Sequence, residues 1–390
     1  MVGFCQKVDT MQESLRLTIP DSENSMNNPP LESIYFYITG DCNLACRHCW
    51  VSPMYQRKSV SQSALDFDIF CNIIDEAKPL GLTSVKLTGG EPLIHPRIEE
   101  LLSFIRQENL SLNLESNGIA LTPEIADMIA SIKNPFVSIS LDGIDASTHE
   151  WMRGVIGSYD MTLKGIRTII NAGIKPQIIM TLTRRNVHQI EALLNLAQFE
   201  GAESVKFNIL QPVARGKSLY EQGESLSVLE LIQIGSWIEK DIAPSAQIRV
   251  NFSHPYAFQP LNRLFHNNYF CGTCRIHRIL GVLHDGSYAL CGIGQTVPEL
   301  IFGHASTDRL SDLWYSEPTL QKIRKGIPDQ LKRTCRECVM KNLCLGYCVA
   351  QNFISNHDLF APFWYCEEAA KMGLFPETRV RVSNDTTEGS

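Results

Sequence analysis

Short apolar runs alternate with longer amphipathic stretches between residues 33 and 240, and this alternation constrains the fold more than any other feature. Six runs read as strands followed by helical stretches: "SIYFYIT", "SVKLTGG", "LSLNLESNG", "PFVSISLDG", "PQIIMTLT" and "SVKFNIL". The first helix is expected over residues 63–78, where apolar residues recur on one face. Strands that alternate with helices predict a parallel sheet with right-handed crossovers. Six units are fewer than the eight of a closed barrel, so we expect an α/β fold with an open, partial (β/α)6 TIM-like barrel.

Polar residues gather directly after these expected strands, at 42–49, 89–91, 115–118, 142–143 and 186. The carboxyl ends of parallel strands meet at one edge of a sheet, and ligands bind at that edge in α/β folds. Five polar clusters on one rim would be unusual in a purely structural chain. The sequence therefore predicts one ligand site at this edge.

Charge and hydropathy narrow the range of partners. The chain has 390 residues and a net charge of −7, without a dense run of Lys or Arg, which disfavours a nucleic-acid partner. No stretch of 18 or more apolar residues is present to cross a bilayer, and the first 30 residues lack the apolar core of a signal peptide. We expect a cytoplasmic protein with neither nucleic acid nor membrane as a partner.

Three of the 13 cysteines lie close together in "CNLACRHCW", at Cys42, Cys46 and Cys49. A disulfide framework is disfavoured, because nothing marks export and the chain is not small. A closed zinc site needs four ligands, for which His48 or Asp41 could supply the fourth, but His48 is poorly placed because it is adjacent to Cys49. An iron–sulfur cube accepts three thiolates and leaves one iron open for a ligand. The cluster is the favoured interpretation, with zinc as the alternative.

This C-x3-C-x2-C loop after the first strand resembles the signature of the radical SAM family. The resemblance implies a [4Fe–4S] cluster on the three cysteines and S-adenosylmethionine (SAM) as the ligand of the open iron. "LTGGEP" resembles the family's GGEP segment, in which Gly89 and Gly90 allow a close approach of the backbone and Glu91 accepts from the methionine ammonium group. "ESNG" resembles the third-strand motif and adds Ser116 and Asn117 to the expected cofactor site.

Other cofactor contacts follow from the same resemblance. Ser140 and Asp142 in "SISLDG" are expected to hydrogen-bond ribose hydroxyls, and Arg153 in "HEWMRG" is expected to face the methionine carboxylate. Asn186 and the segment that starts at Phe207, "FNILQPVARG", are expected to complete the adenine and ribose side. No catalytic residue is assigned beyond the cluster.

The region after residue 260 is rich in cysteine, and its spacing resembles the SPASM domain that follows many radical SAM barrels. The pattern lies in "CGTCRIHRILGVLHDGSYALC" and "CRECVMKNLCLGYC", followed by Cys366. The resemblance implies two auxiliary [4Fe–4S] clusters. One would use Cys271, Cys274, Cys291 and Cys348, and the other Cys335, Cys338, Cys344 and Cys366. Two zinc sites are the alternative.

The expected organisation has five parts. They are a polar tail at 1–30, the barrel at 31–240, a connection at 241–270, an α+β SPASM domain at 271–372 and a tail at 373–390. About 30 residues before the barrel are too few for a leader-binding domain. Recognition of a leader peptide is therefore expected from a separate protein, or not at all.

The resemblance implies three [4Fe–4S] clusters, SAM and a flavodoxin- or ferredoxin-type reductant. Reductive cleavage of SAM would give a 5′-deoxyadenosyl radical, because the cofactors perform the bond-breaking and the protein positions them. Proteins with both domains mostly modify peptides, so we expect oxidative modification of a ribosomally made precursor, such as a thioether or C–C crosslink.

Three alternatives remain. One is a radical SAM enzyme that acts on a small metabolite or cofactor precursor. Formylglycine formation is a second, disfavoured because Gly292 stands where the sulfatase-maturing branch carries an aspartate base. The third is a non-enzymatic metal or electron-transfer protein.

Overall fold

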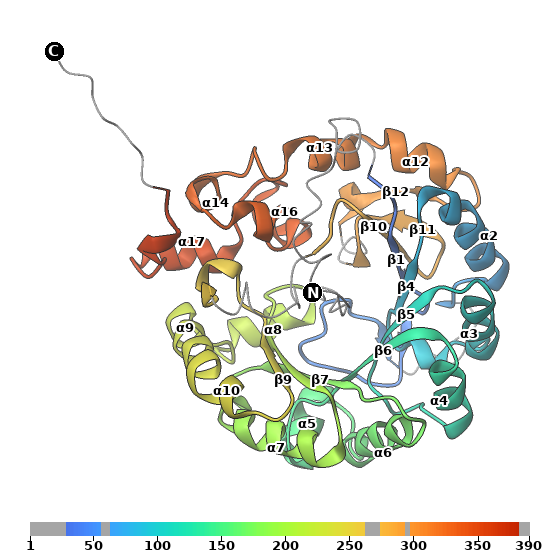
Figure 1. The fold of residues 1–390 in the computed structure, drawn as a ribbon, viewed down its shortest axis with the longest axis horizontal. Helices are drawn as coiled ribbons and strands as arrows, with labels where there is room; N and C mark the ends of the chain where they lie inside the picture. The colour runs from blue at the N-terminus through green and yellow to red at the C-terminus, as the bar shows by residue number, and fades with distance from the viewer. Residues whose placement is uncertain (1–28, 56–62, 262–273, 293–296, 382–390) are drawn as a thin grey trace, which may run out of the picture.

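The computed structural model describes residues 29–55, 63–261, 274–292 and 297–381. Its centre is a ten-stranded sheet that curves into an open barrel, with helices on the outside (Figure 1). The strands that form the barrel are β1 Ser33–Tyr37, β4 Ser84–Thr88, β5 Ser111–Ser116, β6 Lys133–Ser140, β7 Gln177–Leu182, β8 Ser204–Ile209 and β9 Arg249–Phe252. They pair in this order and all in parallel. The expected six-unit partial barrel is confirmed, and β9 adds a further parallel strand at one edge.

The cysteine-rich region continues the same sheet at its other edge. Its strands are β10 Ile279–Val282, β11 Ser287–Ala289 and β12 Ile301–His304. β10 pairs in parallel with β1, while β11 and β12 follow as an antiparallel extension. The expected boundary at 241–270 stays a prediction, but this pairing joins the two regions into one sheet.

A separate two-stranded sheet flanks the first cysteine loop. It pairs β2 Asp41–Cys42 with β3 Met54–Tyr55 in parallel. The loop from Cys42 to Cys49 therefore lies between two short strands that are paired with each other.

Helices cross over between the strands. Those of the barrel are α2 Phe67–Ala77, α3 Ile98–Gln107, α4 Pro123–Ala130, α5 Ala146–Arg153, α6 Ser158–Asn171, α7 Ile190–Glu200, α8 Arg215–Glu221, α9 Val228–Trp237 and α10 Ala243–Ser245. The C-terminal region adds α12 Leu310–Ser316, α13 Pro318–Gly326, α14 Arg333–Glu337, α15 Lys341–Cys344, α16 Val349–Asn356 and α17 Trp364–Lys371. None of the helices in the described part of the chain is long and apolar enough to cross a membrane.

Local sequence explains where these elements start. The helix expected over 63–78 begins only at Phe67, because the Asp66 side chain accepts from the backbone N–H groups of Asp68 and Ile69 as an N-cap. Ala64 instead forms a β-bridge with Thr39. Strands β1, β4 and β7 are buried at every position, as expected for a parallel sheet that is covered on both faces.

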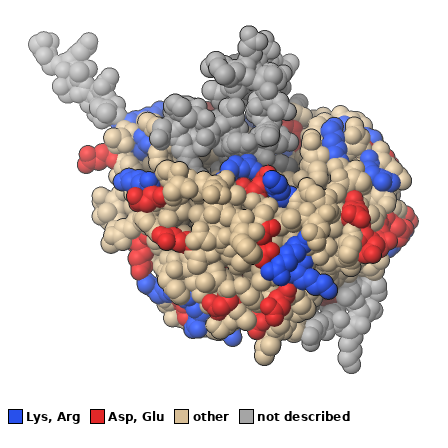
Figure 2. All heavy atoms as spheres, turned by 60° about the horizontal axis from the view of Figure 1, so that its bottom comes forward, with Lys and Arg blue, Asp and Glu red and all other residues tan. Residues whose placement is uncertain are grey.

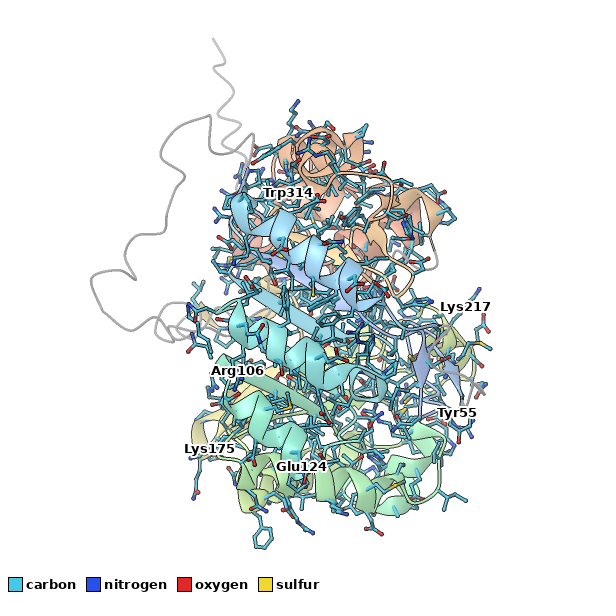
Figure 3. All side chains as sticks on the ribbon, turned by 90° about the vertical axis from the view of Figure 1, so that its right-hand side faces the viewer. Tyr55, Arg106, Glu124, Lys175, Lys217 and Trp314 are labelled. Carbon is cyan, nitrogen blue, oxygen red and sulfur yellow. The ribbon has the colours of Figure 1, made fainter. Side chains whose placement is uncertain are left out.

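The two ends of the barrel can be told apart in Figure 3. Tyr55 and Lys217, which follow β1 and β8, lie at one end, and Arg106 and Lys175, which precede β5 and β7, lie at the opposite end. All the polar clusters noted in the sequence therefore belong to the end marked by Tyr55 and Lys217, where the strands terminate.

Charged side chains of both signs are interspersed on the face shown in Figure 2. Ion pairs such as Arg184–Glu230 and Arg167–Glu200 join neighbouring elements on the surface.

Candidate functional site

The loop that carries the first three cysteines is anchored to the end of α5. The backbone N–H groups of Ala45 and Arg47 donate to the carbonyl oxygens of Arg153 and Met152, at 3.1 and 2.9 Å. Gly154 ends α5 with a φ of 73°, and a Cβ there would lie 2.6 Å from the carbonyl oxygen of Ala45. The helix end and the loop therefore fit only with glycine at this contact.

The thiols of this loop point into the protein. Cys42 and Cys46 are buried, and Cys49 is half-buried. Burial raises the pKa of Cys46 to about 11, although Arg153 Nη1, which donates to the sulfur at 3.7 Å, opposes the shift. Thiols in this environment stay protonated unless a metal compensates the charge of the thiolates.

The spacing of these side chains bears on the zinc alternative. In the described ranges, no three His, Cys, Asp or Glu side chains converge closely enough to hold a single metal ion. A tetrahedral zinc site brings its ligands to within about 2–2.3 Å of one ion, whereas a cube of four irons spreads its thiolates over several metals. Within the described ranges, the thiols therefore do not converge on the position of a single ion.

The GGEP segment packs directly against the cysteine loop. A Cβ on Gly90 would lie 1.8 Å from the carbonyl oxygen of Asp41, so only glycine fits. The next residue, Glu91, is buried and accepts from Ser116 Oγ at 2.7 Å and from the backbone N–H of Asn117 at 2.8 Å. Burial raises the pKa of Glu91 to about 7, which makes its carboxylate a receptive partner for a cationic ligand group.

Arg153 is held by a buried carboxylate. Its Nε lies 2.7 Å from Oδ2 of Asp142, and the other oxygen of Asp142 accepts from the backbone N–H of Thr181 at 2.8 Å. Burial raises the pKa of Asp142, but the Arg153 guanidinium, together with His48 and the hydrogen bond from Thr181, outweighs burial, and the pKa lies below its usual value. Asp142 therefore stays ionised and fixes the direction of the guanidinium.

A cavity of ≈ 230 Å³ connects these groups with the cysteine-rich region. It is lined by six cysteines: Cys42, Cys46, Cys49, Cys274, Cys291 and Cys348. The expected cofactor contacts that line it are Gly89, Gly90, Glu91, Ser116, Asn117, Ser140 and Arg153. The structure thus brings two sets of thiols from distant parts of the sequence to one cavity. Cys271 lies outside the described residues.

Three of the expected cofactor contacts do not line the cavity: Asp142, Asn186 and Phe207. Asp142 faces Arg153, as described above. The amide of Asn186 is fully buried and bonds to backbone atoms of Thr183, Thr181 and Asp142, so it shapes the turn after β7.

Phe207 lies in the hydrophobic core because side chains alternate along a strand. The next residue along β8, Asn208, lines the cavity instead. Alternation along "SVKFNIL" could have indicated this. Gln211 and Arg215, which lie in the segment expected to complete the adenine and ribose side, also line the cavity.

The remaining cysteines meet at a second, smaller cavity of ≈ 20 Å³. Its lining includes Cys335, Cys338, Cys344 and Cys366. Burial raises the pKa of Cys335 to about 11. The four thiols expected to share one auxiliary site therefore lie around one buried space.

Gly292 follows Cys291, which lines the main cavity, and any side chain at position 292 would require the Tyr37 ring to move. A Cβ on Gly292 would lie 2.0 Å from two ring carbons of Tyr37, whose hydroxyl is hydrogen-bonded to the Gly292 backbone. The Tyr37 ring, at the end of β1, packs edge-on against Trp50 next to Cys49. Tyr37 thus fills the space in which an acidic side chain at position 292 would have to stand.

Comparison with known proteins agrees with this arrangement. Residues 36–197 match the radical SAM superfamily, and residues 271–339 match the SPASM iron–sulfur cluster-binding domain. The first match spans the loop of Cys42 to Cys49 and the strands up to β7. The second begins at the cysteines on the other side of the cavity.

Relatives extend over most of the chain. An AdoMet-dependent heme synthase of Methanosarcina barkeri is 27% identical over 352 residues, which is 88% of this chain and 97% of the relative. The mycofactocin maturase MftC of Mycolicibacterium smegmatis is 26% identical over 366 residues, 90% of this chain and 87% of the relative. Among solved structures, Streptococcus suis SuiB bound to the precursor peptide SuiA shares the fold, with a TM-score of 0.68 at 17% identity over 88% of this chain and 78% of that one.

The family resemblance seen in the motifs is thereby confirmed. The two matched domains imply [4Fe–4S] clusters, and the radical SAM domain implies SAM as the second cofactor. The chain is a radical SAM enzyme that carries a C-terminal SPASM iron–sulfur domain.

Proposed function

We propose that this enzyme oxidatively modifies a ribosomally made precursor peptide, with formation of a thioether or C–C crosslink. The observation that carries the proposal is the cavity between Cys42, Cys46 and Cys49 on one side and Cys274, Cys291 and Cys348 on the other. A substrate there would lie between a site of radical generation and a second redox site. A mycofactocin maturase among the relatives and a peptide-bound structural neighbour support a peptide as the substrate.

The proposed SAM site uses residues that line the cavity. Cys42, Cys46 and Cys49 would hold the cluster, and SAM, when bound there, supplies the radical that starts the reaction. Glu91 would accept from the methionine ammonium group, and Arg153 would face the carboxylate, to which its guanidinium is complementary.

The ribose and adenine side would be bound by the strand ends. Asn117 and Ser140 line the cavity there and present polar side chains. Three of the expected residues would support this wall without touching SAM: Asp142, Asn186 and Phe207. Asp142 orients Arg153, and Asn186 fixes the turn after β7.

The proposed ligands of the auxiliary clusters are supported by the cavity that each described cysteine lines. Cys274, Cys291 and Cys348, with Cys271, would hold the cluster that faces the substrate. Cys335, Cys338, Cys344 and Cys366 would hold the second one, at the smaller cavity.

The proposed setting is the cytoplasm, with a flavodoxin- or ferredoxin-type reductant and either a separate leader-binding protein or none. All eleven cysteines in the described ranges are free thiols, which fits a reducing compartment.

A second candidate function is the oxidation of a small cofactor precursor. The similarity to the AdoMet-dependent heme synthase favours it, because the alignment covers 97% of that relative. A tetrapyrrole would then occupy the cavity in place of a peptide segment.

The test is anaerobic reconstitution with iron and sulfide, followed by dithionite reduction. We expect 5′-deoxyadenosine to increase when a precursor peptide encoded near the gene is added, and the peptide to lose two hydrogens by mass spectrometry. Stimulation by a tetrapyrrole substrate but by no such peptide would favour the second function. A colourless, zinc-loaded protein that does not cleave SAM would contradict both.

A further inference from the structure

Lys86 and Glu115 form a buried ion pair in the wall of the main cavity, and none of the proposed cofactor contacts uses it. Lys86 Nζ lies 2.6 Å from Glu115 Oε2, and their side chains are only 4% and 18% exposed. Lys86 is on β4 opposite Asn113 of β5, and Glu115, two residues further along β5, faces the same side. Both residues line the cavity.

The environment of the pair fixes it in place. The ammonium of Lys86 also lies 4.9 Å from the centre of the Tyr35 ring, a cation–π contact. Burial raises the pKa of Glu115, but Lys86 outweighs burial and the pKa lies below its usual value. Glu115 is therefore a rigid, ionised acceptor.

One oxygen of Glu115 accepts no hydrogen bond from the part of the chain that the structure describes. Oε1 is buried and has no hydrogen-bond partner among the described residues, whereas Oε2 is paired with Lys86. Glu91, the other carboxylate that lines the cavity, accepts hydrogen bonds at both of its oxygens. An unused buried carboxylate oxygen costs about 1–3 kcal/mol or more, and a ligand donor would remove that cost.

The surrounding charges indicate which donor fits. Lys86 already pairs with the charge of Glu115 in the wall, and Lys206, which does not line the cavity, also lowers the pKa of Glu115. A cationic group of a substrate would meet the positive charge of Lys86 beside the same carboxylate. A neutral N–H group carries no net charge, so Lys86 would not repel it, and it can still donate a hydrogen bond to Oε1 of Glu115.

We infer that the Lys86–Glu115 pair belongs to the substrate site, where Glu115 accepts a hydrogen bond from a backbone N–H of the peptide and Lys86 fixes its orientation. The inference rests on the proposed function and deepens it, because it names the group of the substrate that is recognised. Lys86 and Glu115 are then binding residues, and the donor lies on the peptide main chain near the modified residue.

The variant Glu115→Gln tests this with little change of shape. Lys86 can only donate, so the amide oxygen of the glutamine will face Lys86 and its NH₂ group will face the substrate. The NH₂ group of the glutamine then faces the backbone N–H of the peptide, and two donors cannot form a hydrogen bond with each other. The affinity for the peptide should fall about tenfold or more, in line with the loss of a buried hydrogen bond.

The measurement is fluorescence anisotropy of a labelled precursor peptide that the wild-type enzyme modifies, with anaerobic, cluster-loaded protein and no reductant. Analogues of this peptide are methylated at one backbone nitrogen at a time along the modified segment. We expect one methylation to weaken binding about tenfold in the wild type and to have no further effect in Glu115→Gln. Glu115→Asp keeps the charge and should give intermediate affinity.

Ser138→Ala is the matched control. Ser138 is opposite Glu115 in the register of β5 and β6 and is also in the interior, but it does not line the cavity. It should bind the peptide as the wild type does. Iron content and SAM affinity equal to those of the wild type show that each variant is folded.

Two results would overturn the inference. One is an unchanged response to N-methylation in Glu115→Gln, and the other is tighter binding by this variant, which would mean that Lys86 binds an anionic group of the substrate. Failure of the proposed function looks different, because the wild-type enzyme itself would then give no peptide product.

Discussion

At the scale of single residues, the site contains carboxylates that are held in place for a ligand at a cost to the folded chain. Glu91 is the clearest case, since burial raises its pKa from 4.5 to about 7. Three donors stabilise its ionised form, from Ser116, Asn117 and Leu93, yet burial still dominates. The proposed ammonium group of SAM would supply the charge that the protein lacks there.

This shift predicts how stability depends on pH. Above about pH 4.5 the unfolded chain loses the proton of Glu91, while the folded chain keeps it up to about pH 7. The free energy of unfolding therefore falls as the pH rises through this window. Urea denaturation of the iron-free wild type and of Glu91→Gln should show a difference between the two that changes by about 3 kcal/mol from pH 4.5 to 7.5. A difference independent of pH would contradict the shift.

Asp142 gives a second prediction for a single residue. Replacing it with Asn leaves Arg153 buried without its anionic partner, so the guanidinium is no longer directed at the cavity. We expect Asp142→Asn to bind SAM at least tenfold more weakly in equilibrium dialysis, with the iron content unchanged. The control is Asp145→Asn, at the N-cap of α5, the helix that carries Arg153, and it should keep the wild-type affinity for SAM. Equal affinities in the two variants would show that Asp142 does not position Arg153.

At the scale of elements, the cysteine loop depends on the end of α5. Gly154 and Gly173 both have positive φ, of 73° and 87°, but only Gly154 faces another part of the backbone. Alanine at either position strains the backbone by about 1 kcal/mol, and at Gly154 it also displaces the loop at Ala45. Gly154→Ala should therefore reconstitute with about four fewer irons per chain, whereas Gly173→Ala keeps the full iron content. Equal iron in both would show that the loop does not need this contact.

The elements themselves could be predicted from the sequence, because strand–helix alternation is a local pattern. The first residue of a helix was harder to predict. The Asp66 side chain caps α2, so the helix begins at Phe67, and the periodicity of apolar residues does not reveal this contact. The grouping of the C-terminal cysteines is not local, because Cys348 is grouped with Cys274 and Cys291 far earlier in the chain, and it came from the resemblance to the SPASM domain. Phe207 and Asn186 show the limit of this approach, because neither lines the cavity. Phe207 lies in β8, but its side chain faces the hydrophobic core. Asn186 follows β7, but its amide is bonded to backbone atoms.

Contacts between distant segments were beyond the reach of the sequence. Glycine at position 292 could be read as the absence of a base, but only the fold shows that the Tyr37 ring, 255 positions earlier in the chain, occupies that space. The Lys86–Glu115 pair was equally invisible, because each residue lies in a run that reads as an ordinary strand and the pairing depends on the register of β4 and β5.

At the scale of the whole molecule, one continuous sheet places the two cysteine regions on opposite sides of a single cavity. The pairing of β10 with β1 makes this possible, since β1 leads directly into the first cysteine loop and β10 and β11 lead into Cys291. The C-terminal helices then supply Cys348 at the start of α16. The distance along the chain between the two sets of thiols is thus bridged by strand pairing rather than by a linker.

This arrangement predicts that two cysteines only four residues apart serve different clusters. Cys344 lines the smaller cavity and Cys348 lines the main one, on either side of a turn in which Leu345, Gly346 and Tyr347 all have positive φ. Each of the variants Cys344→Ala and Cys348→Ala should lose about four irons per chain, from about 12 in the wild type, but the double variant should lose about eight. Iron analysis with electron paramagnetic resonance of the reduced proteins checks this, and Cys71→Ala, on the outer helix α2, is the control that should lose none. If the double variant lost no more iron than either single one, the two thiols would share a cluster and the division between the two cavities would be wrong.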